Sequence, residues 1–283
     1  MLSATLAALV LLAIVLLGVA GGGSAPSPPT PTPGRRNATS PAGRTASGTP
    51  SAAIRRLLGL GLPIYCGGPH GNEVAFTFDD GPGAYTHYAL KKLARANERA
   101  TFFVVGRSID NWPGYLTREL KLAAVEDHTY THVALIFLPP SQITYQLRAT
   151  AQKIQADTGE HVQLWRPPYE LHNPTVDRIA QQLGLLDVLW DDDSQDSIGA
   201  NYAQITKNVE AGLRPGAIIE MHENRGQTIR ALTTLLPALH HRHLRSVSVP
   251  QLLASDPPSP EQVRKGLVGC KNEGEVLTHG GGE

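Results

Sequence analysis

The chain has 283 residues, of which 41% are hydrophobic, and its 25 Lys and Arg equal its 25 Asp and Glu, so the formal net charge is zero. This balance excludes a chain that is mainly a polybasic nucleic-acid-binding protein or mainly an acidic disordered segment. We therefore expect no nucleic acid among its partners. Two Cys exclude a disulfide-dense scaffold and a four-cysteine zinc site, whereas eleven His favour imidazole chemistry.

The N-terminal residues 1–20 contain an uncharged apolar run, 4–20, that ends in small residues. This pattern is typical of a signal peptide, here with cleavage after Ala20. No basic residue precedes the run, and its 17 residues are close to the shortest length that spans a bilayer, so an uncleaved membrane anchor is the alternative. Both interpretations predict an exported protein that is secreted or associated with the cell envelope.

Residues 21–50 hold seven Pro, six Gly, four Ser and five Thr, and no aromatic residue. Such a segment has too little apolar surface to offset the entropy of ordering, which predicts an extended linker. Residues 1–50 also carry three Arg and no acidic residue, so residues 51–283 have a surplus of three negative charges.

Beyond residue 70, short apolar segments alternate with segments of helical periodicity. The predicted strands are 74–78, 100–105, 122–125, 162–165, 186–190, 217–221 and 243–247. The predicted helices are 85–97, 113–121, 141–157, 174–184, 201–213 and 226–241. This alternation predicts a parallel β/α architecture of about seven strands, and periodicity alone does not distinguish a barrel from an open doubly wound sheet.

Polar, titratable residues follow nearly every predicted strand: Asp79 and Asp80, His128 and His132, Arg166, the run 191–196, and His222. In a closed parallel barrel, the C-terminal ends of the strands share one mouth, where such folds build their active sites. The placement of these residues therefore favours a distorted (β/α) barrel.

Two of these clusters together suggest a catalytic metal site. Asp79 and Asp80 repel each other unless a cation separates them, so one could bind a metal while the other acts as a base; a plain Asp-Asp-Gly turn is the alternative. His128 and His132 are four residues apart, a spacing that lets both imidazoles meet one ion, although a surface pair has the same spacing. With Asp80 they make a half-open ligand set of two nitrogens and one oxygen, as expected for catalytic Zn²⁺.

Five motifs in order carry a resemblance to a known family: 77–82 (Thr-Phe-Asp-Asp-Gly-Pro), 128–132 (His-Thr-Tyr-Thr-His), 166–169 (Arg-Pro-Pro-Tyr), 190–196 and 218–222 (Ile-Ile-Glu-Met-His). They resemble the motifs of the polysaccharide deacetylase family, also called the NodB-homology or carbohydrate esterase family four domain. The resemblance covers about residues 70–250. It implies a distorted (β/α) barrel that uses a divalent metal, usually zinc, to hydrolyse N- or O-acetyl groups on sugars. On this basis we predict a deacetylase domain at 51–256 and a C-terminal tail at 257–283.

The resemblance also implies a role for each matching residue. Asp80, His128 and His132 would hold the metal, and Asp79 would take a proton from the attacking water. Arg166 would orient that base, for which its fixed guanidinium fork suits it better than Lys would; an ordinary surface ion pair is the alternative. The backbone N–H of Tyr169 would stabilise the oxyanion, and His222 would protonate the leaving group. Asp196 would keep His222 charged, with Asp193 as its rival.

The chain departs from the family pattern at three positions in the expected substrate cleft. Glu220 stands where the family usually has Leu in the acetyl pocket, Ser197 replaces a Trp of the substrate wall, and Glu170 replaces Gly. A carboxylate at Glu220 should be paired, protonated or hydrated, with Arg225 and Arg166 as candidate partners. We therefore expect an intact hydrolytic centre in a reshaped, more acidic cleft.

Cys66 and Cys270 flank the predicted domain. In an exported protein, one disulfide that ties the two ends of the domain together is the favoured interpretation, and two reduced thiols are the alternative.

The sequence thus predicts an exported, metal-dependent deacetylase, monomeric, with an acetylated polysaccharide as its partner and Zn²⁺ as its metal. The leading substrate is an N-acetylated cell-wall or chitin-like glycan. An O-acetyl esterase acting on xylan-type polymers is a second enzymatic interpretation. A glycan-binding module without catalysis is the alternative from another class, motivated by Glu220 and Ser197.

Overall fold

The structure is a computed structural model that describes residues 51–271. The predicted signal peptide, the linker at 21–50 and the residues from 272 onward lie outside the described part of the chain, so the predictions about them stay predictions. Within residues 51–271, no helix combines the length and the apolar character needed to cross a membrane.

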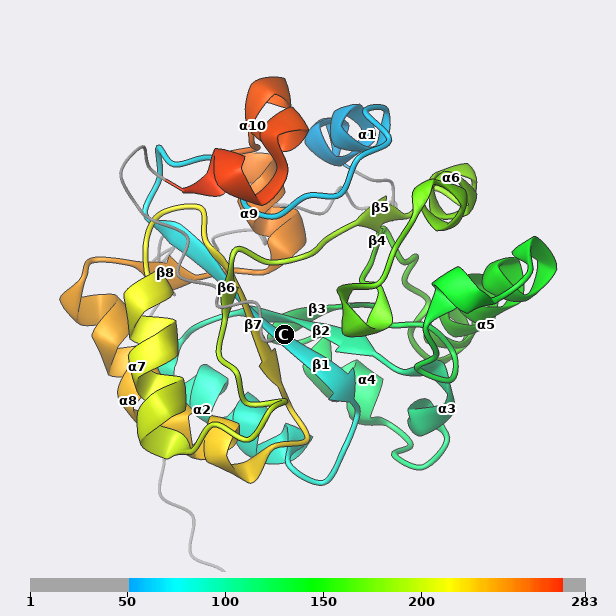
Figure 1. Ribbon diagram of the computed structural model, residues 1–283. Helices are drawn as coiled ribbons and strands as arrows, with labels where there is room; N and C mark the ends of the chain where they lie inside the picture. The colour runs from blue at the N-terminus through cyan, green and yellow to red at the C-terminus, as the bar shows by residue number, and fades with distance from the viewer. Residues whose placement is uncertain (1–50, 272–283) are drawn as a thin grey trace, which may run out of the picture. The chain divides into compact units, whose positions relative to one another are not determined.

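The strands form one curled sheet, a distorted (β/α) barrel, in which every ladder is parallel (Figure 1). The order is β5-β4-β3-β2-β1-β7-β6, with β8 paired to the start of β1. The bounds are β1 Glu73–Gly81, β2 Ala100–Val104, β3 Ala123–Asp127, β4 Leu164–Trp165, β5 Leu186–Asp187, β6 Asp192–Asp193, β7 Ile218–His222 and β8 Arg245–Ser246. The predicted distorted barrel is therefore confirmed.

Six of the helices match the predicted helices to within two residues at each end: α2 Thr86–Ala96, α4 Tyr115–Glu119, α5 Pro140–Thr158, α6 Pro174–Gln182, α7 Tyr202–Gly212 and α8 Gly226–His241. The helices that the sequence analysis missed are short: α1 Ala52–Leu58, α3 Gly106–Ile109, α9 Val249–Ser255 and α10 Pro260–Lys265. Three 3₁₀ turns, η1 Leu135–Phe137, η2 Pro168–Glu170 and η3 Gly266–Cys270, complete the elements of the described residues. Helices of two turns or fewer contain too few residues to show a clear period of 3.6.

The central strand β1 is apolar on both faces. Phe76 and Phe78 pack in one buried cluster with Leu93 of α2 and Leu232 of α8. Ala75, which points the other way, belongs to a separate cluster on the inner side of the sheet. A parallel strand covered on both sides is expected to be a continuous hydrophobic run, and this one becomes polar only at its C-terminal end.

The barrel is completed on one side by an irregular segment between α1 and β1. Ile64 forms a parallel bridge with Val188, just after β5, and Cys66 forms an antiparallel bridge with Ala217, just before β7. The chain from Ile64 to Cys66 therefore spans the gap between the two flanks of the sheet.

The strand β6 was not predicted because its sequence is acidic. Asp192 pairs with Ile219 and Asp193 with Glu220 in the ladder to β7. Arg214 binds the carboxylates of Asp191 and Asp192, each at 2.6 Å. Asp191, just before this strand, is buried.

Residues 260–270, in the segment predicted as a tail, pack on the domain. Val263 of α10 is buried in the same cluster as Ile54 of α1 and Leu252 of α9. Ser259 caps α10 in a capping box with Gln262. Cys270 of η3 forms a disulfide with Cys66, with the two Cα atoms 5.9 Å apart at a sequence separation of 204.

We expect loss of this disulfide to destabilise the domain. A Cys66→Ser/Cys270→Ser variant should lose about 2–4 kcal/mol of unfolding free energy, because the crosslink restricts the unfolded chain. Guanidinium denaturation of the variant and of the oxidised parent measures the difference, and masses taken with and without reductant check the pairing. Equal midpoints for the two proteins would contradict the prediction.

Candidate active site

The two carboxylates at the end of β1 approach the same imidazole because the strand contains a β-bulge. The register with β2 shifts between Asp79 and Gly81, and Asp80 has a φ of 74°. In a regular strand, adjacent side chains would point to opposite faces. Here His128 Nε2 is 3.8 Å from Asp79 Oδ2 and 3.7 Å from Asp80 Oδ1.

The two imidazoles come from a tight loop after β3 and not from a helix. Thr129 and His132 have left-handed φ values of 63° and 56°, which curl the loop back toward β1. His128 Nδ1 lies 2.9 Å from the carbonyl oxygen of Arg166. A carbonyl only accepts, so Nδ1 carries a proton, and Nε2 is the nitrogen that faces the carboxylates.

Asp80, His128 and His132 form a group that fits a metal, and we call it the metal triad. Their ligand atoms all lie within 4.8 Å of one another. Asp80 Oδ1 is buried without a hydrogen-bond partner among the described residues, and it lies 3.1 Å from His132 Nε2. One carboxylate and two imidazoles that leave a coordination position open are the donor set of a catalytic Zn²⁺ site.

The charge states favoured for Asp80 and His132 are those of metal ligands. Burial alone would raise the pKa of Asp80, but the imidazoles of His128, His132 and His222 hold it below its ordinary value. Burial lowers the pKa of His132, and the neighbouring His128 lowers it further. An ionised carboxylate and a neutral imidazole are the forms that bind cations.

Arg166, at the end of β4, is completely buried behind Asp79, so it is not a surface ion pair. Its NH1 donates to Asp79 Oδ1 and to Thr77 Oγ1, each at 2.8 Å. Its Nε and NH2 donate to the carbonyls of Val188 and Leu189 at 2.9 and 3.2 Å. With the guanidinium fixed by the backbone of the next strand, the orientation of the Asp79 carboxylate is fixed as well.

His222, at the end of β7, is held by Asp196. Its Nδ1 lies 2.7 Å from Asp196 Oδ1, and its backbone N–H donates to Asp196 Oδ2 at 2.8 Å. The hydroxyl of Thr228 also donates to Asp196. The rival candidate Asp193 instead accepts the backbone N–H of Gln195 at 2.6 Å, which makes it a turn residue.

Glu220 pairs with the same histidine and not with Arg225 or Arg166, the partners that the sequence analysis suggested. Its Oε1 lies 3.0 Å from His222 Nδ1. Burial raises the pKa of Glu220 well above its ordinary range, against the lowering effect of His222. Burial would lower the pKa of His222, but the hydrogen bond to Asp196 and the charges of Glu220 and Asp196 raise it to about 10.

The remaining predicted cleft residues lie at the surface. Tyr169 is exposed, has a left-handed φ of 62°, and its ring stands edge-on to that of His132 with centroids 4.8 Å apart. Ser197 is exposed, next to the exposed side chain of Ile198. Glu170 is exposed as well, and its charge helps to raise the pKa of Tyr65. Tyr169 thus covers one edge of the metal triad.

Sequence reasoning missed two residues that support the site. Thr77 accepts from Arg166 and donates to the carbonyl of Ile219 at 2.8 Å. It is two residues before Asp79, so the period of a strand could have placed it on the same face. Thr228 had no such signal, because only the fold brings α8 beside Asp196.

Comparison with known proteins gives consistent matches. The family model described as polysaccharide deacetylase matches residues 67–188. The chain is 34% identical over 182 residues to a peptidoglycan-N-acetylglucosamine deacetylase of Listeria monocytogenes, covering 64% of this chain but only 38% of that protein. It is 31% identical to a chitooligosaccharide deacetylase of Bradyrhizobium, covering 64% of this chain and 90% of the relative.

Among solved structures, a family 4 carbohydrate esterase from Streptomyces lividans in complex with acetate matches with a TM-score of 0.60 and 32% identity. The match covers 64% of this chain and 92% of that structure. The residues 67–188 that the family model matches include β1 and the loop after β3, which carry the metal triad.

Proposed function

Because this chain belongs to the polysaccharide deacetylase family, we propose that it removes N-acetyl groups from a cell-wall or chitin-like polysaccharide that contains N-acetylglucosamine. One observation carries the proposal: a base held by a buried arginine and an imidazole held by a buried carboxylate flank the same ligand set. His222 Nε2 lies 3.9 Å from Asp80 Oδ2, and Asp79 is joined to Arg166 at 2.8 Å.

We propose that the metal triad binds a divalent cation, Zn²⁺ in the first instance. When bound, such a cation polarises the acetyl carbonyl and makes water a stronger nucleophile at neutral pH. The oxygen of Asp80 that has no hydrogen-bond partner among the described residues, and the orientation of His128 Nε2 toward it at 3.7 Å, are the features that support this assignment.

The residues around the metal triad would divide the proton transfers between them. Asp79, fixed by Arg166, takes a proton from the attacking water. The backbone N–H of Tyr169 donates to the oxygen that becomes negative as the carbonyl is attacked. His222 then gives its Nε2 proton to the departing amine, for which a pKa of about 10 keeps it charged at neutral pH.

The relatives' names guide the choice of substrate. The Listeria relative is named for peptidoglycan N-acetylglucosamine and the Bradyrhizobium relative for chitooligosaccharide. We propose a glycan of this class, neutral or cationic at the cleft, because Glu170 adds negative charge to the rim. We also propose that residues 1–20 direct export to the envelope or medium, and that the domain acts as a monomer.

Acetate release from three polymers in parallel tests the function. With Zn²⁺ present, we expect release from N-acetylglucosamine oligomers or peptidoglycan. Release from acetylated xylan alone would favour an O-acetyl esterase. Binding to these glycans without release of acetate from any of them would favour a non-catalytic module.

The two acidic contacts of His222 should differ in their effect on the pH profile. In Asp196→Asn the imidazolium loses its ionised partner, so the pKa of His222 falls and the alkaline limb of kcat/KM moves to lower pH. The rate at neutral pH should fall on the order of 10²-fold, because more of His222 is then deprotonated at neutral pH and cannot donate a proton to the leaving group. Glu220→Gln should move the limb less, because the hydrogen bond to Asp196 is the largest of the effects that raise the pKa of His222 and Glu220 acts through its charge alone. Equal shifts in the two variants would contradict this assignment.

A further inference from the structure

A second group of metal-ligating side chains lies behind the loop that carries Tyr169. His172 follows η2, Asp177 lies near the start of α6, and Asp187 ends β5, and each places a ligand atom within 4.8 Å of the others. His172 Nδ1 is 3.1 Å from both carboxylate oxygens of Asp177. We call these three residues the α6 cluster, and none of them belongs to the metal triad.

The unpaired carboxylate of Asp187 points to a ligand. The residue is only 5% exposed, and neither of its carboxylate oxygens has a hydrogen-bond partner within residues 51–271. Burial raises its pKa to about 8 against the lowering effect of His172. Protonation does not satisfy the group, since a neutral carboxyl still needs an acceptor for its O–H and a donor for its carbonyl oxygen. A bound cation would satisfy the Asp187 carboxylate directly.

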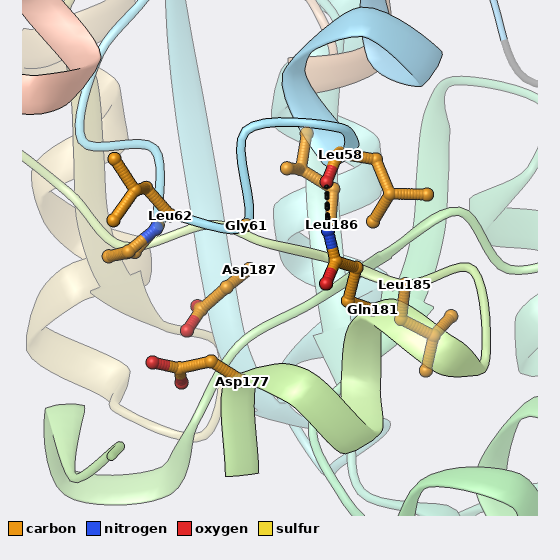
Figure 2. Close-up of a pocket in the computed structure, with 9 residues that line it drawn as sticks. Leu58, Gly61, Leu62, Asp177, Gln181, Leu185, Leu186 and Asp187 are labelled. Atoms are coloured by element: carbon orange, nitrogen blue, oxygen red, sulfur yellow. Dashed lines mark hydrogen bonds between the residues drawn. The ribbon is translucent and has the colours of Figure 1, made fainter. Parts of the chain in front are cut away.

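A small pocket lies beside the two carboxylates of the cluster. Figure 2 shows the carboxylates of Asp177 and Asp187 next to each other, both on the side away from Gln181. Asp177 and Asp187 help to line this pocket, whose volume is about 10 Å³, the size of one water, and His172 lies outside its lining. Gln181 also lines it, but its amide donates to the carbonyl of Leu58 at 2.8 Å and turns away from Asp187 (Figure 2).

The neighbouring side chains leave the cluster short of positive charge. Arg166 lowers the pKa of Asp187, but its guanidinium directs its hydrogen bonds to Asp79, Thr77 and the carbonyls after β5. The negative charge of Glu170 raises the pKa of both Asp187 and His172. The cluster is open enough for an ion to enter, since the side chains of His172 and Asp177 are 24% and 17% exposed.

We propose that His172, Asp177 and Asp187 form a second divalent-cation site that fixes the loop bearing Tyr169 and Glu170 to β5. One imidazole nitrogen and two carboxylates suit Zn²⁺, whereas Ca²⁺ takes six to eight oxygen ligands. The site is structural: it contacts no reacting group of the proposed deacetylation, and its occupancy does not depend on that activity.

Zinc titration in a chain without the metal triad tests the site. The full chain carrying His128→Ala and His132→Ala should still bind one equivalent of Zn²⁺ by calorimetry, and its Tm should rise with Zn²⁺. Adding His172→Ala or Asp187→Asn should remove both effects. His70→Ala is the matched control: His70 also lies 3.1 Å from an aspartate, Asp256, but belongs to no such three-residue cluster, and zinc binding should persist.

The test separates this site from the proposed function. Absence of zinc binding in the background chain, or its persistence in His172→Ala, would overturn the second site, as would Ca²⁺ binding as tight as that of Zn²⁺. Should Asp187→Asn not fold, the partly exposed His172→Ala keeps the test decisive. Zinc bound at the α6 cluster of a chain that releases no acetate would leave the second site standing and contradict the deacetylase proposal alone.

Discussion

His128→Ala should abolish acetate release and reduce the zinc stoichiometry of the full chain by one equivalent. The substitution removes an imidazole whose Nε2 is directed toward Asp80 Oδ1 by the hydrogen bond from Nδ1 to the Arg166 carbonyl. Without that nitrogen, the metal triad keeps one imidazole and one carboxylate, too few for a tight site. Metal analysis after dialysis and an acetate assay on the same preparation measure the two effects together.

The control is His241→Ala, an exposed histidine at the end of α8. It should retain both zinc stoichiometry and activity. Activity in His128→Ala that survives treatment with a chelator would contradict a metal-dependent mechanism at this site.

Arg166→Met should be the single change most damaging to stability, and it should lower the rate as well. It removes the only cation that contacts Asp79 through a short hydrogen bond among the described residues, and it leaves a nearly buried carboxylate unpaired. Breaking a buried ion pair from one side typically costs about 3–5 kcal/mol. Arg166→Lys keeps the charge but not the fork that reaches Asp79, Thr77 and two carbonyls, so we expect the rate to fall on the order of 10²-fold.

A double-mutant cycle separates the two roles of Arg166. Adding Asp79→Asn to Arg166→Met removes the stranded charge, so the double variant should be less destabilised than the sum of the single variants. Arg178→Met, at an exposed position of α6, should change neither stability nor rate appreciably. Additive losses in unfolding free energy would contradict a direct coupling between Arg166 and Asp79.

The departures from the family pattern differ in burial, since Glu220 is buried whereas Ser197 and Glu170 are exposed. Glu220 was expected to be paired, protonated or hydrated, and the fold places it against His222, where its pKa rises well above the ordinary range. A carboxyl that pairs with the imidazole of His222 is compatible with an intact centre. The added acidity of the cleft therefore rests mainly on the exposed Glu170.

The sequence by itself determined the alternation of strands and helices and the order of the catalytic motifs along the chain. Each is a local property: β1 is a hydrophobic run ending in Asp79 and Asp80, and α8 has a period of 3.6 over four turns. Because the C-terminal ends of parallel strands converge, these local patterns were enough to predict a shared site at the barrel mouth.

Only the tertiary structure decided which of several similar side chains takes each position in the candidate site. Asp196 rather than Asp193 binds His222 because β6 pairs with β7 in one register, which turns Asp193 toward its own loop. The β-bulge that brings Asp79 and Asp80 together depends on a single left-handed residue. The α6 cluster joins residues from α6, β5 and the loop between β4 and α6, and Asp187 is unpaired only because the fold buries it. Hydrogen-bond partners and burial arise from contacts between distant segments, and no local period encodes them.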